Sequence, residues 1–300
     1  MTLKEEFIIL GYTKDDYDAI RNSYPISSIK DETLIEKVRD NYSFLLKLGY
    51  KREEIIKITK SLPEIYGYST RTIEQKMKDM ISLGYTKEEV IRMTKNSPSI
   101  YSYSIETIKK KIDDIISLGY TRKEVIKMTK GLSQIYGYSI EGIKQKIDDM
   151  ISLGYTKEEV IKMTKSFTPI YGLSIESMKQ KIDDMISLGY TRKEVINMTK
   201  DLPAIYGYSK KNMKQKKDFY DSIGLHELVS VDPKQLIQSV NLSYARYCFY
   251  KSQGIDIDMN NYRKLFVREN QFQKSNGITK QELIEKYDYD KYEEQRKMKL

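Results

Sequence analysis

The segment TKEEVIRMTKNSPSIYSYSIETIKKKIDDIISLGY, residues 86–120, decides the fold of this chain. Its closing Leu-Gly-Tyr recurs, with small variations, in strict register every 35 residues. The glycines of the six copies are Gly49, Gly84, Gly119, Gly154, Gly189 and Gly224, and Gly11 precedes them by 38 residues. A fixed period of this length is typical of small helical units that stack into an elongated array. The repeat therefore directs attention to a long binding surface rather than to an enclosed active site.

The first part of each repeat predicts a short helix that begins at a threonine. Thr86 and Glu89 form a Thr-x-x-Glu capping box, in which each side chain can accept a hydrogen bond from the other's backbone amide. The same pair recurs at Thr121/Glu124, Thr156/Glu159 and Thr191/Glu194. Val90 and Met93 then fall on one side of the helix, where they can face a core.

The second part of each repeat predicts a short link and a longer helix. Pro98 interrupts the first helix, because proline lacks an amide donor and disfavours helix in the residue before it. Ile100, Tyr101 and Tyr103 are expected to form a short apolar link with one turn of 3₁₀ helix, and Ser104 can cap the next helix. Its predicted buried stripe consists of Ile105, Ile108, Ile112, Ile115 and Ile116. Gly119 is free to end this helix in the left-handed conformation.

These elements predict an all-α fold, a right-handed α-solenoid of about 35-residue helical repeats with helical caps at both ends. We expect an N-terminal cap with an irregular first repeat in residues 1–48. Five regular repeats are expected in residues 49–224 and a C-terminal helical cap in residues 225–300. The single cysteine, Cys248, and the acidic start of the chain favour a reducing, cytoplasmic setting. No apolar stretch reaches about 18 residues, so we expect no membrane partner.

The basic charge of the chain is concentrated in the repeats. Residues 49–224 contain 32 Lys and Arg against 23 Asp and Glu, which accounts for the formal net charge of +9. Such an excess on a repeated surface favours a polyanionic partner, with nucleic acid considered before an anionic membrane surface. Solubility alone is the simpler alternative.

The repeat resembles the motif of the mitochondrial transcription termination factor (mTERF) family. The resemblance rests on Gly-Tyr-Thr-x-x-Glu-Val, then Pro-x-Ile-Tyr-x-Tyr-Ser, then a lysine-rich isoleucine helix ending in Leu-Gly, over residues 10–224. The proline is present at Pro25, Pro63, Pro98 and Pro203, whereas Ser133 replaces it and Pro169 stands one residue late. The resemblance implies a solenoid of three-helix repeats that binds double-stranded nucleic acid along its concave face. It also implies a role in organelle transcription, RNA processing or translation, and without a transit peptide a bacterial or phage relative fits better.

A second similarity is to TAL-effector-like DNA readers, whose repeats join two helices by a variable loop. The segments between the helices here differ from copy to copy although the flanking residues do not. Their first residues are Ser61, Asn96, Gly131, Ser166 and Asp201. These positions could read base edges, because base identity is recognised by side-chain type. The alternative is that loop residues vary because nothing packs on them.

Two columns of lysines are candidates for contact with phosphate. One column ends the first helix of each repeat, with no carboxylate one turn earlier: Lys60, Lys95, Lys130, Lys165 and Lys200. The other lies beside the apolar stripe of the second helix: Lys76, Lys111, Lys146, Lys181 and Lys216. Stacked helices lie roughly 8–10 Å apart, so each column could meet every second or third phosphate of a strand. A solvated helix face is the alternative interpretation.

The tyrosines at fixed places in the repeat could stack on unpaired bases, but packing is the favoured interpretation. One set follows the link isoleucine, as in Tyr101, and another follows the turn glycine, as in Tyr85. Both occupy corners where helices meet, so we expect packed rings with hydroxyls at the surface.

Catalysis finds little support in the sequence. His226 is the only histidine, and no cysteine pair or glycine-rich phosphate loop is present. Asp113 and Asp114 are adjacent carboxylates, but neighbouring helix positions point about 100° apart. We therefore expect no enzyme, no cofactor, no metal site and no small-molecule substrate.

The leading hypothesis is a non-enzymatic solenoid that binds double-stranded DNA in preference to RNA and regulates transcription. One alternative is a protein-interaction solenoid whose partner is helical or acidic, and another is an RNA-binding repeat protein. A protein partner could also bind the aromatic residues of the C-terminal cap, Tyr244, Tyr247, Phe249 and Tyr250.

Overall fold

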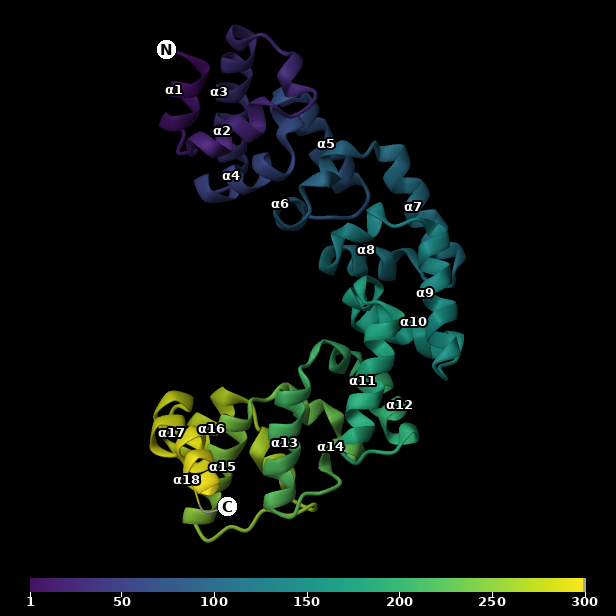
Figure 1. Cartoon of the computed structure of the whole chain (residues 1–300), viewed down its shortest axis with the longest axis vertical. Coiled ribbons are helices and arrows are strands. Elements are labelled where there is room, and N and C mark those ends of the chain that lie inside the picture. Colours follow the sequence, from purple (N-terminus) through teal and green to yellow (C-terminus); the bar gives the residue numbers. More distant parts are fainter. Residues whose placement is uncertain (299–300) are drawn as a thin grey trace. The chain divides into compact units, whose positions relative to one another are not determined.

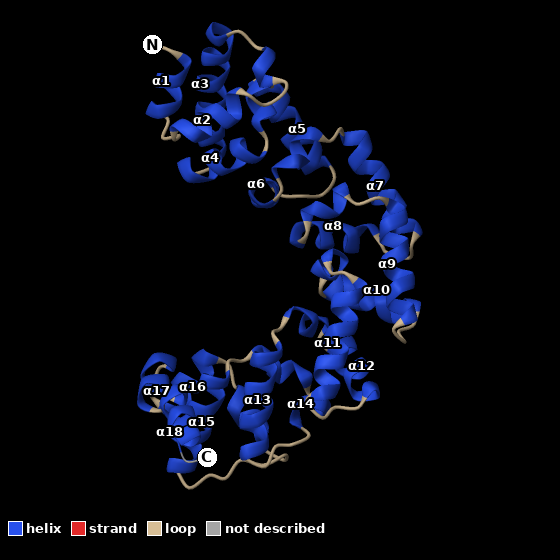
Figure 2. Ribbon diagram, in the orientation of Figure 1, coloured by secondary structure: helices blue, strands red, loops and turns tan. Residues whose placement is uncertain are grey.

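The computed structural model describes the backbone of residues 1–298 and the side chains of residues 1–295. Every regular element in this part of the chain is helical, and no strand occurs in it (Figure 2). The all-α prediction is therefore confirmed. The chain divides into two compact units, Met1–Asp148 and Asp149–Leu300. No helix among the described residues is long and apolar enough to cross a membrane.

The first unit contains an irregular start followed by regular repeats. Its α-helices are α1 (Leu3–Ile9), α2 (Lys14–Arg21), α3 (Asp31–Leu48), α4 (Arg52–Ser61), α5 (Thr70–Ser82), α6 (Lys87–Asn96), α7 (Ile105–Ser117) and α8 (Arg122–Gly131). Its 3₁₀ helices are η1 (Ile26–Ser28), η2 (Pro63–Gly67), η3 (Pro98–Ser102) and η4 (Ser133–Gly137). The boundary of the unit falls within α9 (Ile140–Ser152).

The second unit first continues the repeated order of helices, and its last part departs from that order. Its regular part contains α10 (Lys157–Ser166), η5 (Thr168–Gly172), α11 (Ile175–Ser187), α12 (Arg192–Asp201), η6 (Pro203–Gly207) and α13 (Lys210–Ser222). Its last part contains α14 (Leu228–Val231), η7 (Pro233–Ile237), α15 (Val240–Ser252), η8 (Tyr262–Phe266), α16 (Glu269–Asn276), α17 (Lys280–Lys286) and α18 (Tyr289–Met298). The three-part division predicted from the sequence stays a prediction.

Each repeat is a first helix, a 3₁₀ helix and a longer second helix, stacked like on like. In the first unit α4, α6 and α8 are neighbours in one layer, and α3, α5 and α7 are neighbours in another (Figure 1). The 3₁₀ helices join the layers, since η3 contacts both α6 of its own repeat and α4 of the preceding one. In the second unit α10 and α12 form the first layer, and α11, α13 and α15 the second.

The local signals in the sequence set these helix ends. Thr86, Thr121, Thr156 and Thr191 all cap their helices, and all four capping boxes are formed. Gly84 and Gly119 follow the second helices with φ values of 109° and 111°, which only glycine adopts readily.

The 3₁₀ helix forms even where the proline is missing. Ser133 takes the first position of η4, and Thr168 takes that of η5 with Pro169 behind it. The first residue of a helix has no use for its amide, so proline is favoured there without being required. The two departures from the family motif therefore leave the element intact.

The core of a repeat follows the predicted apolar pattern. Val90 and Met93 of α6, Ile100 of η3 and Ile112 of α7 are buried between the layers. Ile108 and Ile115 are buried with them, whereas Ile105 and Ile116, at the edges of the predicted stripe, are half-buried. Burial of one such side chain contributes roughly 1.5–3 kcal/mol.

The aromatic residues of the C-terminal part pack against neighbouring helices. Tyr244 and Tyr247 of α15 place their ring centroids 6.0 and 6.2 Å from that of Phe219 on α13. Phe249 and Tyr250 lie 5.5 and 5.9 Å from Phe272 on α16. These contacts give the aromatic run a structural role, and a protein partner at this end stays a prediction.

Candidate nucleic-acid interface

The first lysine column forms ion pairs between successive repeats. Four of its five lysines reach an acidic residue in the first turn of the preceding first helix. The pairs are Lys60–Asp16 at 2.5 Å, Lys95–Glu54 at 2.8 Å, Lys130–Glu89 at 2.8 Å and Lys200–Glu159 at 3.0 Å. Lys165 is not free either. The absence of a carboxylate one turn earlier therefore does not leave these lysines unpaired, and their contact with phosphate stays a prediction.

The acidic partners are the carboxylates of the capping interactions. A backbone hydrogen bond from Lys51 and then the Lys95 ammonium hold the pKa of the Glu54 carboxyl below its usual value. Lys130 and then the backbone of Thr86 do the same for the pKa of Glu89. Each carboxylate therefore stays charged near neutral pH, satisfies a helix N-terminus and binds the next repeat.

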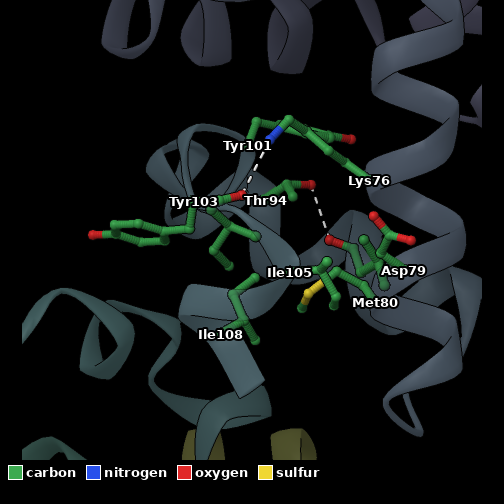
Figure 3. A pocket seen from close by; sticks show the side chains of 10 residues that line it. Lys76, Asp79, Met80, Thr94, Tyr101, Tyr103, Ile105 and Ile108 are labelled. Atoms are coloured by element: carbon green, nitrogen blue, oxygen red, sulfur yellow. Dashed lines mark hydrogen bonds between the residues drawn. The ribbon is translucent and has the colours of Figure 1, made fainter. Parts of the chain in front are cut away.

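The second lysine column donates hydrogen bonds to the backbone of the following repeat. Lys76 Nζ lies 3.1 Å from the carbonyl oxygen of Tyr103, the residue that ends η3 (Figure 3). Corresponding bonds are Lys111 to Tyr138, Lys181 to Tyr208 and Lys216 to Leu236. Lys146 also has a partner. This column is therefore also used within the stack, and its contact with phosphate stays a prediction.

These hydrogen bonds are half-buried or buried parts of the stack. Figure 3 shows Lys76 at the edge of a packed site that includes Met80 and Ile108, where the remaining cavity has a volume of only about 10 Å³. Burial lowers the pKa of Lys76, and it lowers that of Lys216, which is almost fully buried, to about 8. Asn41 has the equivalent place in α3, where its amide donates to the carbonyls of Ile65 and Tyr68.

The tyrosines form hydrogen-bonded groups inside the stack. Tyr50 Oη lies 2.5 Å from Thr94 Oγ1 and 2.9 Å from Tyr101 Oη of the following repeat. The same group recurs around Tyr12, Tyr85 and Tyr155. The packing interpretation is confirmed, but the hydroxyls are buried rather than at the surface. These rings are consequently closed to stacking on bases.

A third column of cations lies on the exposed face of the first helices. Its members are Lys57, Arg92, Lys127 and Lys162, on α4, α6, α8 and α10. All four are exposed, and none forms an ion pair or a side-chain hydrogen bond with any residue whose side chain the structure describes. A glutamate stands four residues before three of them, and Lys123 stands before Lys127. In the fifth repeat the position is Asn197.

The variable positions lie beside this column. Ser61, Asn96, Gly131, Ser166 and Asp201 are the last residues of their first helices, and all are exposed. Each follows the cation position by four residues, so the two share a face of the helix. In the first unit Lys57, Arg92 and Lys127, with Ser61, Asn96 and Gly131, form a surface on three neighbouring helices. We call it the basic face.

A periodicity signal for this column was present in the sequence. Basic residues recur every 35 residues from Lys57 to Lys162. Glu88, one turn before Arg92 on the same helix, makes the Arg92 position resemble an internally paired charge, whereas no carboxylate precedes Lys95 by one turn. The true partner of Lys95 lies 41 residues back, in another repeat.

The stacked helix–3₁₀–helix units define the molecule as a helical-repeat protein. The mTERF family model matches residues 19–152 and 143–187, more than half of the sequence, and the chain belongs to this family. Members of the family are generally non-enzymatic, nucleic-acid-binding repeat proteins. A comparison with curated proteins gave no match.

Proposed function

We propose that this protein binds double-stranded DNA through the basic face and regulates transcription, in a bacterial or phage setting. The observation that carries the proposal is the column of exposed cations on α4, α6 and α8 that form no ion pair with any described side chain, in a chain of the mTERF family. Cations that are already paired add little net charge at the surface. Those of the basic face are not held in an ion pair by any described side chain, so they can turn to a polyanion, although Glu53 and Glu88 stand one turn before Lys57 and Arg92.

The spacing of the column suits a regular phosphate backbone. Packed helices lie roughly 8–10 Å apart, and phosphates rise about 3.4 Å each along a strand. Neighbouring members of the column can therefore reach phosphates two or three apart on one strand. A duplex keeps this spacing constant, whereas a flexible single strand does not.

Double-stranded nucleic acid is also favoured by the state of the aromatic residues. Single strands are bound largely by stacking of unpaired bases on exposed aromatic rings. The repeated tyrosines Tyr50, Tyr85 and Tyr101 are buried and hydrogen-bonded, so they supply no such platform. Duplex RNA remains the competing ligand, and an acidic protein helix is the competing partner of a different class.

Two further groups complete the proposed interface. Ser61, Asn96 and Gly131 differ in donor and acceptor capacity and lie next to the phosphate-binding cations, where they can approach base edges. The ammonium of Lys60 is part of the same helix end, and its side chain is 51% exposed. The lysine columns that contain Lys60 and Lys76 thus hold the repeats together. Their ammonium groups add phosphate contacts only where they reach solvent.

The test is the salt dependence of binding to random duplex DNA and duplex RNA. The chain offers two triple variants of equal charge change. One is Lys57→Ala, Arg92→Ala and Lys127→Ala on the basic face. The control is Lys109→Ala, Lys110→Ala and Lys144→Ala, at exposed lysines of the second helices α7 and α9.

We expect the slope of log K against log salt to fall by roughly 0.9 for each phosphate contact removed from the basic face. The control should keep most of the wild-type slope. An equal loss in both triple variants would mean that net charge, not the basic face, drives binding. Absence of any retention on DNA or RNA at about 50 mM salt, with capture of an acidic protein helix, would favour the protein-interaction alternative.

A further inference from the structure

The C-terminal part of the second unit contains an open pocket with a strongly basic lining. Its volume is about 840 Å³, and it lies between η7, α15, α16 and the start of α17. Its charged lining residues are Lys234, Arg246, Arg268, Lys280 and a single carboxylate, Glu269. Lys280 pairs with Glu269 at 2.8 Å, and the other three cations of the lining form no ion pair with this carboxylate.

Arg246 is the unusual member of this lining, because it is 1% exposed. Its Nη1 donates to the carbonyl of Leu265 at 2.8 Å and to Gln238 Oε1 at 3.2 Å, and its guanidinium lies 4.7 Å from the ring centroid of Phe272. Its Nε has no hydrogen-bond partner, and no carboxylate among the described side chains forms an ion pair with it. A buried charge without a counterion is costly unless something offsets it.

To bind the carbonyl of Leu265, as the stacking of the helices requires, Arg246 needs only one donor. Lys111, Lys181 and Lys216 perform the same task in the repeats, since each donates to a carbonyl at the following 3₁₀ helix. An arginine has five donors in a planar fork, whereas a lysine supplies one ammonium. The guanidinium therefore has more donors than the stacking of helices uses, and Arg246 is part of the pocket lining although its Nε is itself buried.

Two helix N-termini add to the positive potential of the pocket. Ser239, the N-cap of the 13-residue helix α15, lines it, and so does Arg268, the N-cap of the 8-residue helix α16. The Arg268 side chain makes no capping hydrogen bond, so the amides of Glu269 and Asn270 keep their capacity to bind an anion, whereas the amide of Gln271 already donates to Asn270 Oδ1 at 2.8 Å.

We propose that this pocket binds a phosphate monoester, with Arg246, Arg268 and Lys234 as its cationic contacts. The volume falls within the range of small-ligand sites and exceeds the need of inorganic phosphate alone. Phe266 and Ile237 supply an apolar wall on which a nucleoside can rest. The phosphate can belong to a free mononucleotide or to the end of a nucleic-acid strand.

The experiment is calorimetric titration of the full chain with inorganic phosphate, adenosine monophosphate and adenosine at constant ionic strength. We expect the first two to bind and adenosine to bind far more weakly. Arg246→Lys keeps the bond to Leu265 but loses the fork, and Arg268→Gln changes only an exposed residue, so at least one variant should fold normally. Each should weaken phosphate binding about tenfold or more, because charge-assisted hydrogen bonds are lost.

The matched control is Lys274→Gln, at an exposed lysine of α16 that is not part of the lining. It should bind phosphate as the wild type does. The proposal is overturned if the wild type binds neither phosphate nor adenosine monophosphate at millimolar concentration. It is equally overturned if adenosine binds as tightly as its monophosphate, or if Arg268→Gln and Arg246→Lys bind unchanged.

The triple variant of the basic face is used to decide whether the phosphate belongs to a free mononucleotide or to a strand end, because its basic face no longer contributes to DNA binding. A DNA hairpin with a 5′-phosphate is compared with the same hairpin carrying a 5′-hydroxyl. Binding that depends on the 5′-phosphate and disappears in Arg268→Gln supports a strand end as ligand. Binding of the free monophosphate alone supports a mononucleotide. Both outcomes support the pocket, and neither depends on whether the basic face binds DNA.

Discussion

Arg92 and Lys95 lie one turn apart on α6, recur with the same period, and serve different purposes. Arg92 is exposed and forms no ion pair with a described residue, whereas Lys95 binds Glu54 of the preceding repeat at 2.8 Å. The ammonium of Lys95 also lies 5.8 Å from the ring centroid of Tyr50. In a stacked array, a periodic cation can serve the neighbouring repeat or an external partner. The position of the cation relative to the surface that packs on the neighbouring repeat decides which of these two roles it has.

The largest expected effect is a loss of stability at high pH, caused by the tyrosine hydroxyls that are buried inside the stack. Burial raises the pKa of Tyr12 and Tyr220 to about 12 and raises the pKa of Tyr66 and Tyr101 well above 10. A raised folded-state pKa means that stability is fully present below pH 10, the unfolded value, and is lost as the pH rises above it. We expect a loss of about 1.4 kcal/mol per pH unit for each such tyrosine.

The measurement is urea unfolding between pH 8 and pH 11.5. The steep loss should begin near pH 10, and Tyr101→Phe, which has no hydroxyl to ionise, should make it less steep. An unfolding free energy that stays constant up to pH 11 would show that the hydroxyls are not buried as described.

The next effect separates two lysines of the helix α7. Lys111→Ala removes the donor to the carbonyl of Tyr138 and leaves that carbonyl without its bond in a half-buried place. We expect a loss of roughly 1–3 kcal/mol in the free energy of unfolding. Lys109→Ala, at an exposed position two residues earlier, should change it by less than about 0.5 kcal/mol. Equal effects would remove the structural role assigned to the second lysine column.

The fold could be predicted from the sequence because its signals are local. The Thr86–Glu89 capping box joins two residues three positions apart, and Gly119 acts at its own position. The roles of the lysines could not be predicted in this way. Lys76 binds a carbonyl 27 residues away, and Tyr50 bonds to Thr94 across 44 residues. Such partners depend on how one repeat is placed on the next, which the spacing of residues within a repeat does not specify.

A smaller effect is expected for the ion pair of Lys95. Both side chains are nearly 30% exposed, so solvent screens the attraction, and Lys95→Ala should cost about 0.5–1 kcal/mol. The pKa of Glu54 is lowered in the folded protein, so this contribution is present above about pH 4.5 and is lost as the pH falls further. Thermal unfolding of the variant and the wild type at pH 7 and pH 3 measures both the stability cost of the substitution and its dependence on pH. A cost that persists unchanged at pH 3 would assign it to packing on Tyr50 rather than to charge.

The smallest effect on stability, and the sharpest test of the comparison, is expected for Arg92→Ala. Arg92 has no ion pair or side-chain hydrogen bond with a described residue, so the free energy of unfolding should change by less than about 0.5 kcal/mol. The affinity for duplex DNA should nevertheless fall several-fold at about 0.1 M salt, because one phosphate contact is lost. Lys95→Ala should show the reverse order, with a measurable loss of stability and a smaller loss of affinity. If both variants lose affinity equally, the basic face extends to the ion-paired column, because the ammonium of Lys95 can then exchange Glu54 for a phosphate when DNA binds.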